Sequence, residues 1–163
     1  MYGLILVPLD SSETAQHGFE EALGLARTLG CALRIVNVVD VRLLPAEISG
    51  HVSVGQLLEQ WREDGCRLVG EAAARARAVG VRAEEAVLCD PGLRVADLIV
   101  EEARRCGAGL IVMGTHGRRG LRRMTLGSDA ELVVREAPVP VMLVRSTPRA
   151  AAVATTVDCA RAA

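Results

Sequence analysis

Residues 109–128 have the sequence GLIVMGTHGRRGLRRMTLGS, and this stretch decides the fold. An apolar run at 109–113 has the length of a buried strand, a loop rich in glycine and arginine follows at 114–126, and a helical pattern starts at Ser128. A strand without polar residues, followed by a helix, is typical of a parallel sheet that is covered on both faces. The stretch therefore predicts an α/β protein.

The same alternation of strand and helix covers the preceding and following chain. Apolar runs predict strands, and apolar residues at intervals of three or four predict helices. We expect strands at 2–9, 32–39, 81–89, 109–113 and 139–145, and helices at 12–29, 54–79, 95–106 and 128–136. Right-handed crossovers then favour an open, doubly wound five-stranded parallel sheet of order 3-2-1-4-5, with helices on both faces in a three-layer sandwich.

Polar residues and glycines mark where the helices begin and end. Ser12 is suited to cap the first helix, and Gly30 is suited to end it. Gly65 and Gly70 leave open whether 54–79 forms one continuous helix.

The length fits one domain with one core. Beyond Arg145 the sequence becomes rich in alanine and threonine. We therefore expect a domain of residues 1–146 and a C-terminal tail, 147–163, outside the core.

Charge and aromatic content exclude several functions. All 19 basic residues are arginine, and 20 acidic residues bring the net charge to -1. This balance argues against binding to nucleic acid or to a membrane surface, and the scarcity of aromatic residues leaves little for base stacking. Without lysine, the chain can form neither a Walker A phosphate loop nor a lysine Schiff base.

Cysteine and hydropathy patterns predict the compartment. The five cysteines form no C-x-x-C pair, so we expect reduced thiols in a cytoplasmic protein. The three histidines show no metal-ligand spacing. No apolar stretch approaches the ~18 residues that a membrane span requires.

A binding site is expected where the first and fourth strands end. Ligands of doubly wound sheets bind at the carboxyl ends of the strands, where the strand order reverses. The first strand ends in VPLDSS, at 7–12, and the fourth ends in MGTHG, at 113–117.

The second of these loops has the features of an anion site. Glycines bring backbone N–H groups close to an anion, and the start of the following helix, at Gly127-Ser128, adds further N–H groups. Ser128 is suited to cap that helix or to donate its hydroxyl to a phosphate. Positive charge comes from Arg118, Arg119, Arg122 and Arg123. The alternative is a flexible loop with ordinary turn glycines and a solvated basic face.

The spacing in this loop resembles that of one known family. Gly114, Gly117, Gly127 and Ser128 fit G-x2-G-x9-G-[ST], which is similar to the nucleotide-binding motif of the ATP-binding branch of the universal stress proteins. The resemblance covers about residues 2–146, and it includes VPLD at 7–10, VVD at 38–40, DP at 90–91 and APVPVMLV at 137–144.

The resemblance implies a role for each matching residue. Asp10 and Pro8 are expected beside the adenosine, and Val38 beside the adenine. The ribose and phosphate path is expected along Met113, Gly114, His116 and Gly117, with Arg118 and Arg119 nearby and Gly127 and Ser128 at the distal phosphates. Without the resemblance, Asp10 is also typical of a turn before a helix, His116 of a loop histidine bonded to backbone, and Val38 of the core.

One position departs from the family pattern. Asp129 stands where an apolar residue is frequent, and Ala130 lacks a hydroxyl that some relatives have nearby. A carboxylate there favours the helix dipole but repels phosphate, unless a divalent cation bridges them. We expect moderate affinity for ATP or another adenine nucleotide, with a Mg²⁺ dependence if Asp129 or Asp10 contacts the metal.

The resemblance implies a nucleotide-binding stress-response or regulatory protein rather than an efficient enzyme. No convincing nucleophile–base pair is present, so at most slow ATP hydrolysis or autophosphorylation is expected. A partner-binding homodimer that uses no nucleotide is the other alternative.

The last strand predicts the assembly. Residues 139–144 are apolar and form the last expected strand, and Pro138 and Pro140 suit a sheet edge. An exposed apolar edge favours pairing, so we expect a homodimer through Val139–Val144. The alternative is that the tail covers this edge.

Overall fold

The structure is a computed structural model of the chain, and it describes residues 2–43, 53–117 and 126–145. The expected tail, at 147–163, lies outside the described residues. No described helix is long and apolar enough to cross a membrane.

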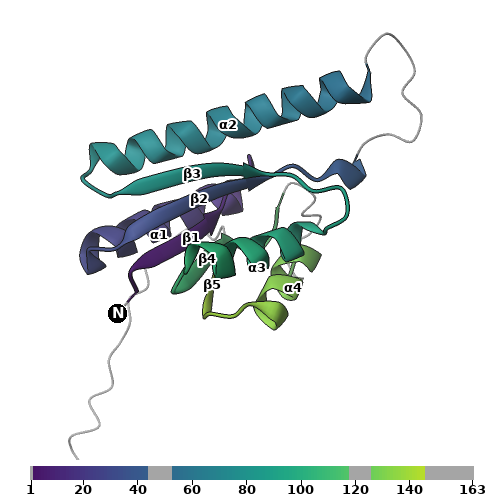
Figure 1. Cartoon of the computed structure of the whole chain (residues 1–163). Coiled ribbons are helices and arrows are strands. Elements are labelled where there is room, and N and C mark those ends of the chain that lie inside the picture. Colours follow the sequence, from purple (N-terminus) through teal and green to yellow (C-terminus); the bar gives the residue numbers. More distant parts are fainter. Residues whose placement is uncertain (1, 44–52, 118–125, 146–163) are drawn as a thin grey trace, which may run out of the picture.

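Five parallel strands form the centre of the molecule (Figure 1). They are β1 (Leu4–Pro8), β2 (Ala32–Val38), β3 (Ala83–Leu88), β4 (Leu110–Gly114) and β5 (Val141–Val144). Their order is β3-β2-β1-β4-β5, and every neighbouring pair is parallel. The predicted sheet is thus confirmed, with β1 between β2 and β4.

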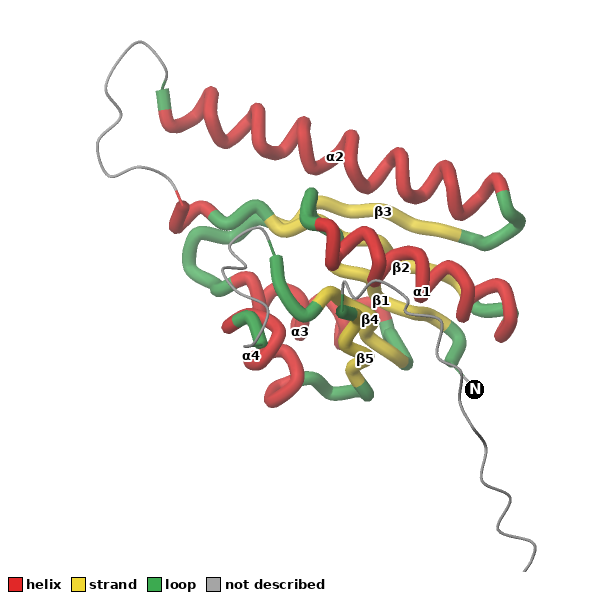
Figure 2. The backbone as a smooth tube through the Cα atoms, turned by 180° about the vertical axis from the view of Figure 1, so that it is seen from behind, coloured by secondary structure: helices red, strands yellow, loops and turns green. Residues whose placement is uncertain are grey.

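Two helices cover each face of the sheet, which completes the predicted three layers. One hydrophobic cluster joins the sheet to α1 (Glu13–Leu29) and α2 (Val54–Ala78), and a second joins its other face to α3 (Val95–Cys106) and α4 (Ser128–Glu136). Figure 2 shows α1 and α2 from their own side of the sheet. A short 3-10 helix, η1 (Val41–Leu43), follows β2.

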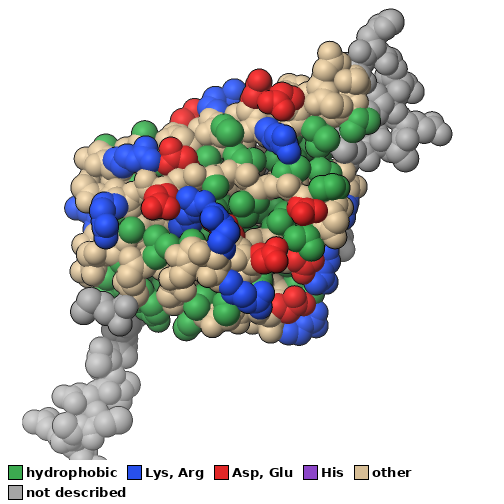
Figure 3. Space-filling view, viewed as in Figure 1, with side chains coloured by type: hydrophobic (Ala, Val, Ile, Leu, Met, Phe, Trp, Pro, Cys, Tyr) green, Lys and Arg blue, Asp and Glu red, His purple; other side chains and the backbone are tan. Residues whose placement is uncertain are grey.

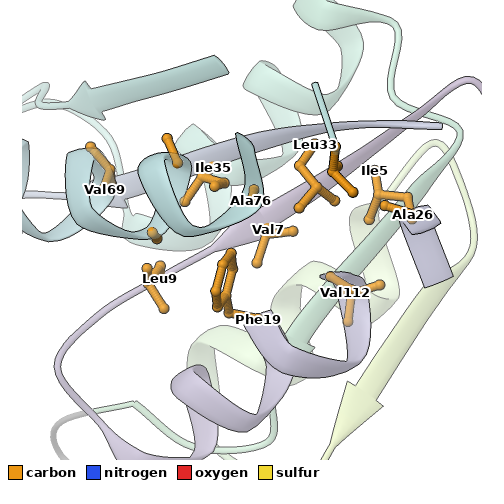
Figure 4. Close-up of a cluster of buried hydrophobic side chains, with 14 of the residues drawn as sticks. Ile5, Val7, Leu9, Phe19, Ala26, Leu33, Ile35, Val69, Ala76 and Val112 are labelled. Atoms are coloured by element: carbon orange, nitrogen blue, oxygen red, sulfur yellow. The ribbon is translucent and has the colours of Figure 1, made fainter. Parts of the chain in front are cut away.

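The first cluster forms the larger core. Phe19 of α1 is fully buried against side chains from β1, β2 and β4, as Figure 4 shows. Alanines on both helices, including Ala26 and Ala76, let the helices pack closely on the sheet. This packing fixes where α1 begins, next to the carboxyl ends of β1 and β4.

The predicted ends of α1 are confirmed. The Ser12 hydroxyl accepts a hydrogen bond from the Ala15 N–H at 3.2 Å, and Gly30 ends the helix with a φ of 67°. The predicted helix at 54–79 is continuous through both of its glycines. A Cβ on Gly65 would lie 2.7 Å from Asn37 Oδ1, so glycine lets α2 approach β2.

The start of the last strand was predicted wrongly, and one of the two roles considered for Ser128 is excluded, although α4 has its predicted bounds. The last strand begins at Val141 rather than Val139, because Pro140 has no N–H for the ladder; only its carbonyl takes part, accepting from Ile111 N at 3.0 Å. Ser128 does not cap α4: Gly127 is the N-cap residue, and Ser128 is already helical.

One buried charge cluster connects α3 to the sheet. Glu102 is 4% exposed, and its Oε1 accepts a 2.8 Å hydrogen bond from Arg34 Nε of β2. Arg105 donates two further hydrogen bonds of 2.7 Å to the same carboxylate. Burial alone would raise the pKa of Glu102, but these hydrogen bonds outweigh it and lower the pKa.

Arginine and acidic side chains are interspersed on the face shown in Figure 3. That face carries no large field of one sign.

Candidate functional site

A cavity of about 340 Å³ opens at the carboxyl ends of the central strands. The chain runs from β1 to β2 and β3 on one side, and returns to β4 and β5 on the other. The cavity lies at this reversal, where a doubly wound sheet binds its ligands. It is lined by residues from β1, β2, β4, η1, α1, α3 and α4 and from their connecting loops.

Hydrogen bonds join the loops that follow β1 and β4. Asp10 Oδ1 accepts from the Ser12 N–H at 2.9 Å and from the Ser12 hydroxyl at 2.5 Å. The Thr14 hydroxyl donates to the His116 carbonyl, across the gap between the two loops. Thr14 is only 8% exposed, so this bond holds one wall of the cavity in place.

Two glycines of the motif allow the close approach of these loops. A Cβ on Gly114 would lie 2.7 Å from the carbonyl carbon of Thr14 and 2.9 Å from Ala15 N. A Cβ on Gly117 would lie 2.9 Å from Asp10 Oδ2. Gly114 is therefore needed for the packing of α1 on β4, besides lining the cavity.

The inner wall of the cavity is apolar. Val36, Ile99 and Met113 lie there and are buried, whereas Val38 is half-buried. A flat, apolar heterocycle is the kind of group that such a wall accommodates, because its burial removes apolar surface from water.

The opposite rim contains the start of α4. Gly127 offers no capping side chain, and no side-chain hydrogen bond caps this helix. The first N–H groups of a helix lack backbone acceptors and carry partial positive charge, so they suit an anion. Gly127 N donates to Thr115 O at 2.9 Å, which fixes the helix start to the end of β4.

Asp40 and Arg42 form a charge pair at the other side of the mouth. Asp40 is 6% exposed and accepts hydrogen bonds from Arg42 N at 3.1 Å, Nε at 2.8 Å and Nη2 at 3.2 Å. The hydrogen bond with Asp40 raises the pKa of Arg42. This arginine therefore compensates the charge of Asp40 in the cavity wall.

The structure brings most of the predicted site residues together. Those that line the cavity are Pro8, Asp10, Val38, Met113, Gly114, His116, Gly117, Gly127 and Ser128. Arg118 and Arg119 lie outside the described residues, as do Arg122 and Arg123.

The alternative interpretations of Asp10 and Val38 agree with the structure, and both residues also line the cavity. Asp10 forms the turn before α1 and also lines the cavity. Val38 packs at the margin of the second cluster and lines the same cavity. The ring Nδ1 of His116 shares a 3.0 Å hydrogen bond with the hydroxyl of Thr115.

Sequence reasoning missed several residues of the wall. Leu43 and Asp40 come from the connection after β2, whose shape was not predicted, and Val95 and Ile99 come from α3. Apolar spacing in a helix indicates which residues face inward, but no sequence signal distinguishes an inward residue over the core from one over a cavity.

The described residues contain no group of three or more His, Cys, Asp or Glu that could hold a metal ion. Any divalent cation in the cavity would therefore need most of its ligands from a bound molecule and from water, which is the usual arrangement for Mg²⁺ with nucleotide phosphates.

Comparison with known proteins agrees with this geometry. The sequence model of the universal stress protein family matches residues 1–145. A universal stress protein of Methanocaldococcus jannaschii is 34% identical over 148 residues, which cover 89% of this chain and 83% of that protein.

Solved structures show the same fold. A universal stress protein family member from Burkholderia pseudomallei is 35% identical and has a TM-score of 0.71, over 88% of this chain and 96% of that chain. The universal stress protein from Archaeoglobus fulgidus in complex with dAMP is 25% identical and has a TM-score of 0.61, over 88% of this chain and 98% of that chain. With a family match over nearly the whole described fold, this chain belongs to the universal stress protein family.

Proposed function

We propose that this chain binds an adenine nucleotide in the cavity between the ends of β1 and β4, and acts as a nucleotide-responsive regulatory protein of the stress response. The observation that carries the proposal is the cavity itself, which joins an apolar wall to an uncapped helix start. The related protein from Archaeoglobus fulgidus, which was solved with dAMP, supports the choice of an adenine nucleotide.

The proposed orientation follows from the polarity of the walls. The base lies against the apolar wall formed by Val36, Val38 and Ile99, where burial favours it. The phosphate end lies toward Gly117 and the start of α4, where N–H groups favour an anion. Asp10 lies between these two regions and is the proposed neighbour of the ribose hydroxyls, whose hydrogen bonds carboxylates accept readily.

ATP is among the proposed nucleotides because the glycine spacing resembles the motif of the family's ATP-binding branch. Mg²⁺ would be held mainly by the phosphates, with Asp129 or Asp10 as its protein ligand, and would neutralise part of their charge. The fit is limited to one or two carboxylates, since the described residues offer no complete metal site.

We propose binding rather than efficient catalysis. The hydroxyls of Ser12 and Thr14, on the loop and helix start beside the cavity, are engaged with Asp10 and with the His116 carbonyl. These hydrogen bonds hold the two loops together, which is the role that we propose for both hydroxyls.

The experiment is an isothermal titration of the full-length protein with AMP and with ATP, in wild type and in two variants. Val38→Phe fills the cavity from its half-buried wall and is expected to weaken binding at least tenfold. Val134→Phe makes the same change on α4, at a residue that is 47% exposed and does not line the cavity, and is expected to leave binding unchanged. Circular dichroism of both variants is the control for correct folding. Absence of binding by the wild type at millimolar nucleotide would reject the proposal.

We further propose that the chain forms a homodimer through β5. This strand pairs only with β4 among the described strands, so its other edge is unpaired there. Met142 is 40% exposed, and the neighbouring residues of β5 are half-buried. An unpaired apolar edge of this kind favours association with a second copy.

A further inference from the structure

Carboxylates dominate the charge of the described part of the cavity wall. Its described lining contains Asp10, Asp40 and Asp129, but neither lysine nor arginine. His116 is the only histidine among the described residues of the lining. A polyphosphate would therefore meet negative charge in the described part of the wall.

The three carboxylates differ in how they are compensated. Arg42 neutralises Asp40 through three hydrogen bonds, and Asp10 accepts two hydrogen bonds from Ser12. Asp129 forms neither a hydrogen bond nor an ion pair with any described residue. Among the described basic residues, Arg42 interacts with the Asp129 carboxylate at longer range.

Asp129 stands on the wall that suits the phosphates. It is half-buried in the first turn of α4, next to the N–H groups that favour an anion. A carboxylate and a phosphate at the same helix start compete for the same N–H groups and repel each other. Each additional phosphate charge raises this repulsion, whereas a bound Mg²⁺ removes part of it.

We propose that Asp129 makes the cavity select its nucleotide by phosphate charge, so that AMP binds more tightly than metal-free ATP. The proposal rests on the proposed adenine-nucleotide function and names the residue that sets the preference. Asp129 is thus a specificity-determining residue. The ratio of the affinity for AMP to the affinity for ATP decreases when Mg²⁺ accompanies ATP.

The test is a set of calorimetric titrations of the full-length protein with adenosine, AMP, ATP in EDTA, and ATP with Mg²⁺. The variant is Asp129→Asn, which removes the charge at almost constant shape. The matched control is Glu131→Gln, which removes one charge from the same helical turn at an exposed residue outside the cavity lining. Both variants change the net charge and the helix dipole in the same way.

In the wild type, we expect AMP to bind at least tenfold more tightly than ATP in EDTA. Asp129→Asn should raise the affinity for ATP in EDTA about tenfold, which is about 1.4 kcal/mol, and change that for adenosine less than threefold. Glu131→Gln should change neither by more than threefold.

Three results would overturn the proposal. The first is that metal-free ATP binds to the wild type as tightly as AMP does. The second is that both variants raise the affinity for ATP equally, because an equal effect would come from the helix dipole. The third is that adenosine, AMP and ATP all fail to bind at millimolar concentration, which would reject the proposed function and with it the preference for AMP over ATP.

Discussion

Replacing Gly114 by alanine tests whether the site depends on the contact between α1 and β4. The added Cβ would lie 2.7 Å from the Thr14 carbonyl carbon, 2.8 Å from its oxygen and 2.9 Å from Ala15 N. Ordinary van der Waals contact begins at 3.4 Å, so α1 and β4 must separate by about 0.7 Å, the difference between that distance and 2.7 Å. All three atoms belong to the backbone, so no side chain can rotate away.

Such overpacking costs about 1–3 kcal/mol of unfolding free energy. In a domain of this size, that lowers Tm by roughly 2–12 °C. The shift also stretches the hydrogen bond between Thr14 and the His116 carbonyl, so nucleotide affinity should fall together with stability.

The assay is urea denaturation, combined with titration of AMP. The control is Gly24→Ala, at an exposed position of α1 where a Cβ would meet nothing within 4 Å; it should gain about 0.5–1 kcal/mol from better helix propensity. Gly114→Ala with wild-type stability and wild-type affinity would refute this account of the wall.

Three further predictions concern the rest of the molecule. Glu102→Gln should cost about 1.5–3 kcal/mol at pH 7, because charged hydrogen bonds to the arginine on β2 are weakened. Folding lowers the pKa of Glu102, so the stability that its carboxylate contributes is fully present above the unfolded pKa near 4.3 and is lost as pH falls through the folded pKa. Urea denaturation from pH 7 to pH 3 should therefore show a smaller loss of unfolding free energy in the variant than in the wild type. Equal losses would contradict this prediction. Gly65→Ala should lower Tm, because the new Cβ would lie 2.7 Å from the Asn37 amide oxygen. Gly70→Ala should raise Tm, because open space surrounds that position. Tm shifts of the same sign in both variants would be inconsistent with the packing of α2 on β2. Val141→Glu should give monomers in sedimentation velocity at concentrations where the wild type is dimeric, and an unchanged dimer would exclude pairing through β5.

The sheet was predictable because its pattern is redundant. Five apolar runs alternate with helical patterns, and the handedness of crossovers then leaves few ways to arrange them. Element ends were less predictable where competing chemistry decides them. Pro140 removes an N–H, so β5 begins two residues later than predicted, and Gly127 takes the N-cap position for which Ser128 was one candidate.

The site was predictable wherever a backbone requirement dictates the residue. Three glycines of the motif leave no room for a Cβ, because other atoms come within about 3.1 Å of the position it would occupy: Gly114, Gly117 and Gly127. Their spacing in the sequence therefore reflects the geometry of the site. Asp40 and Leu43 were not assigned to the cavity, because tertiary packing places η1 there and no local pattern predicts it. The hydrogen bond from Thr14 to the His116 carbonyl was not predicted for the same reason, since the two residues are 102 positions apart in the sequence.

The most direct test of the central claim is a crystal structure of the full-length protein grown with saturating AMP. We predict density for the nucleotide in the cavity between β1 and β4, with the base on the wall formed by Val38 and Ile99 and the phosphate at the start of α4. An empty cavity under these conditions, or AMP bound only at another surface, would contradict the account.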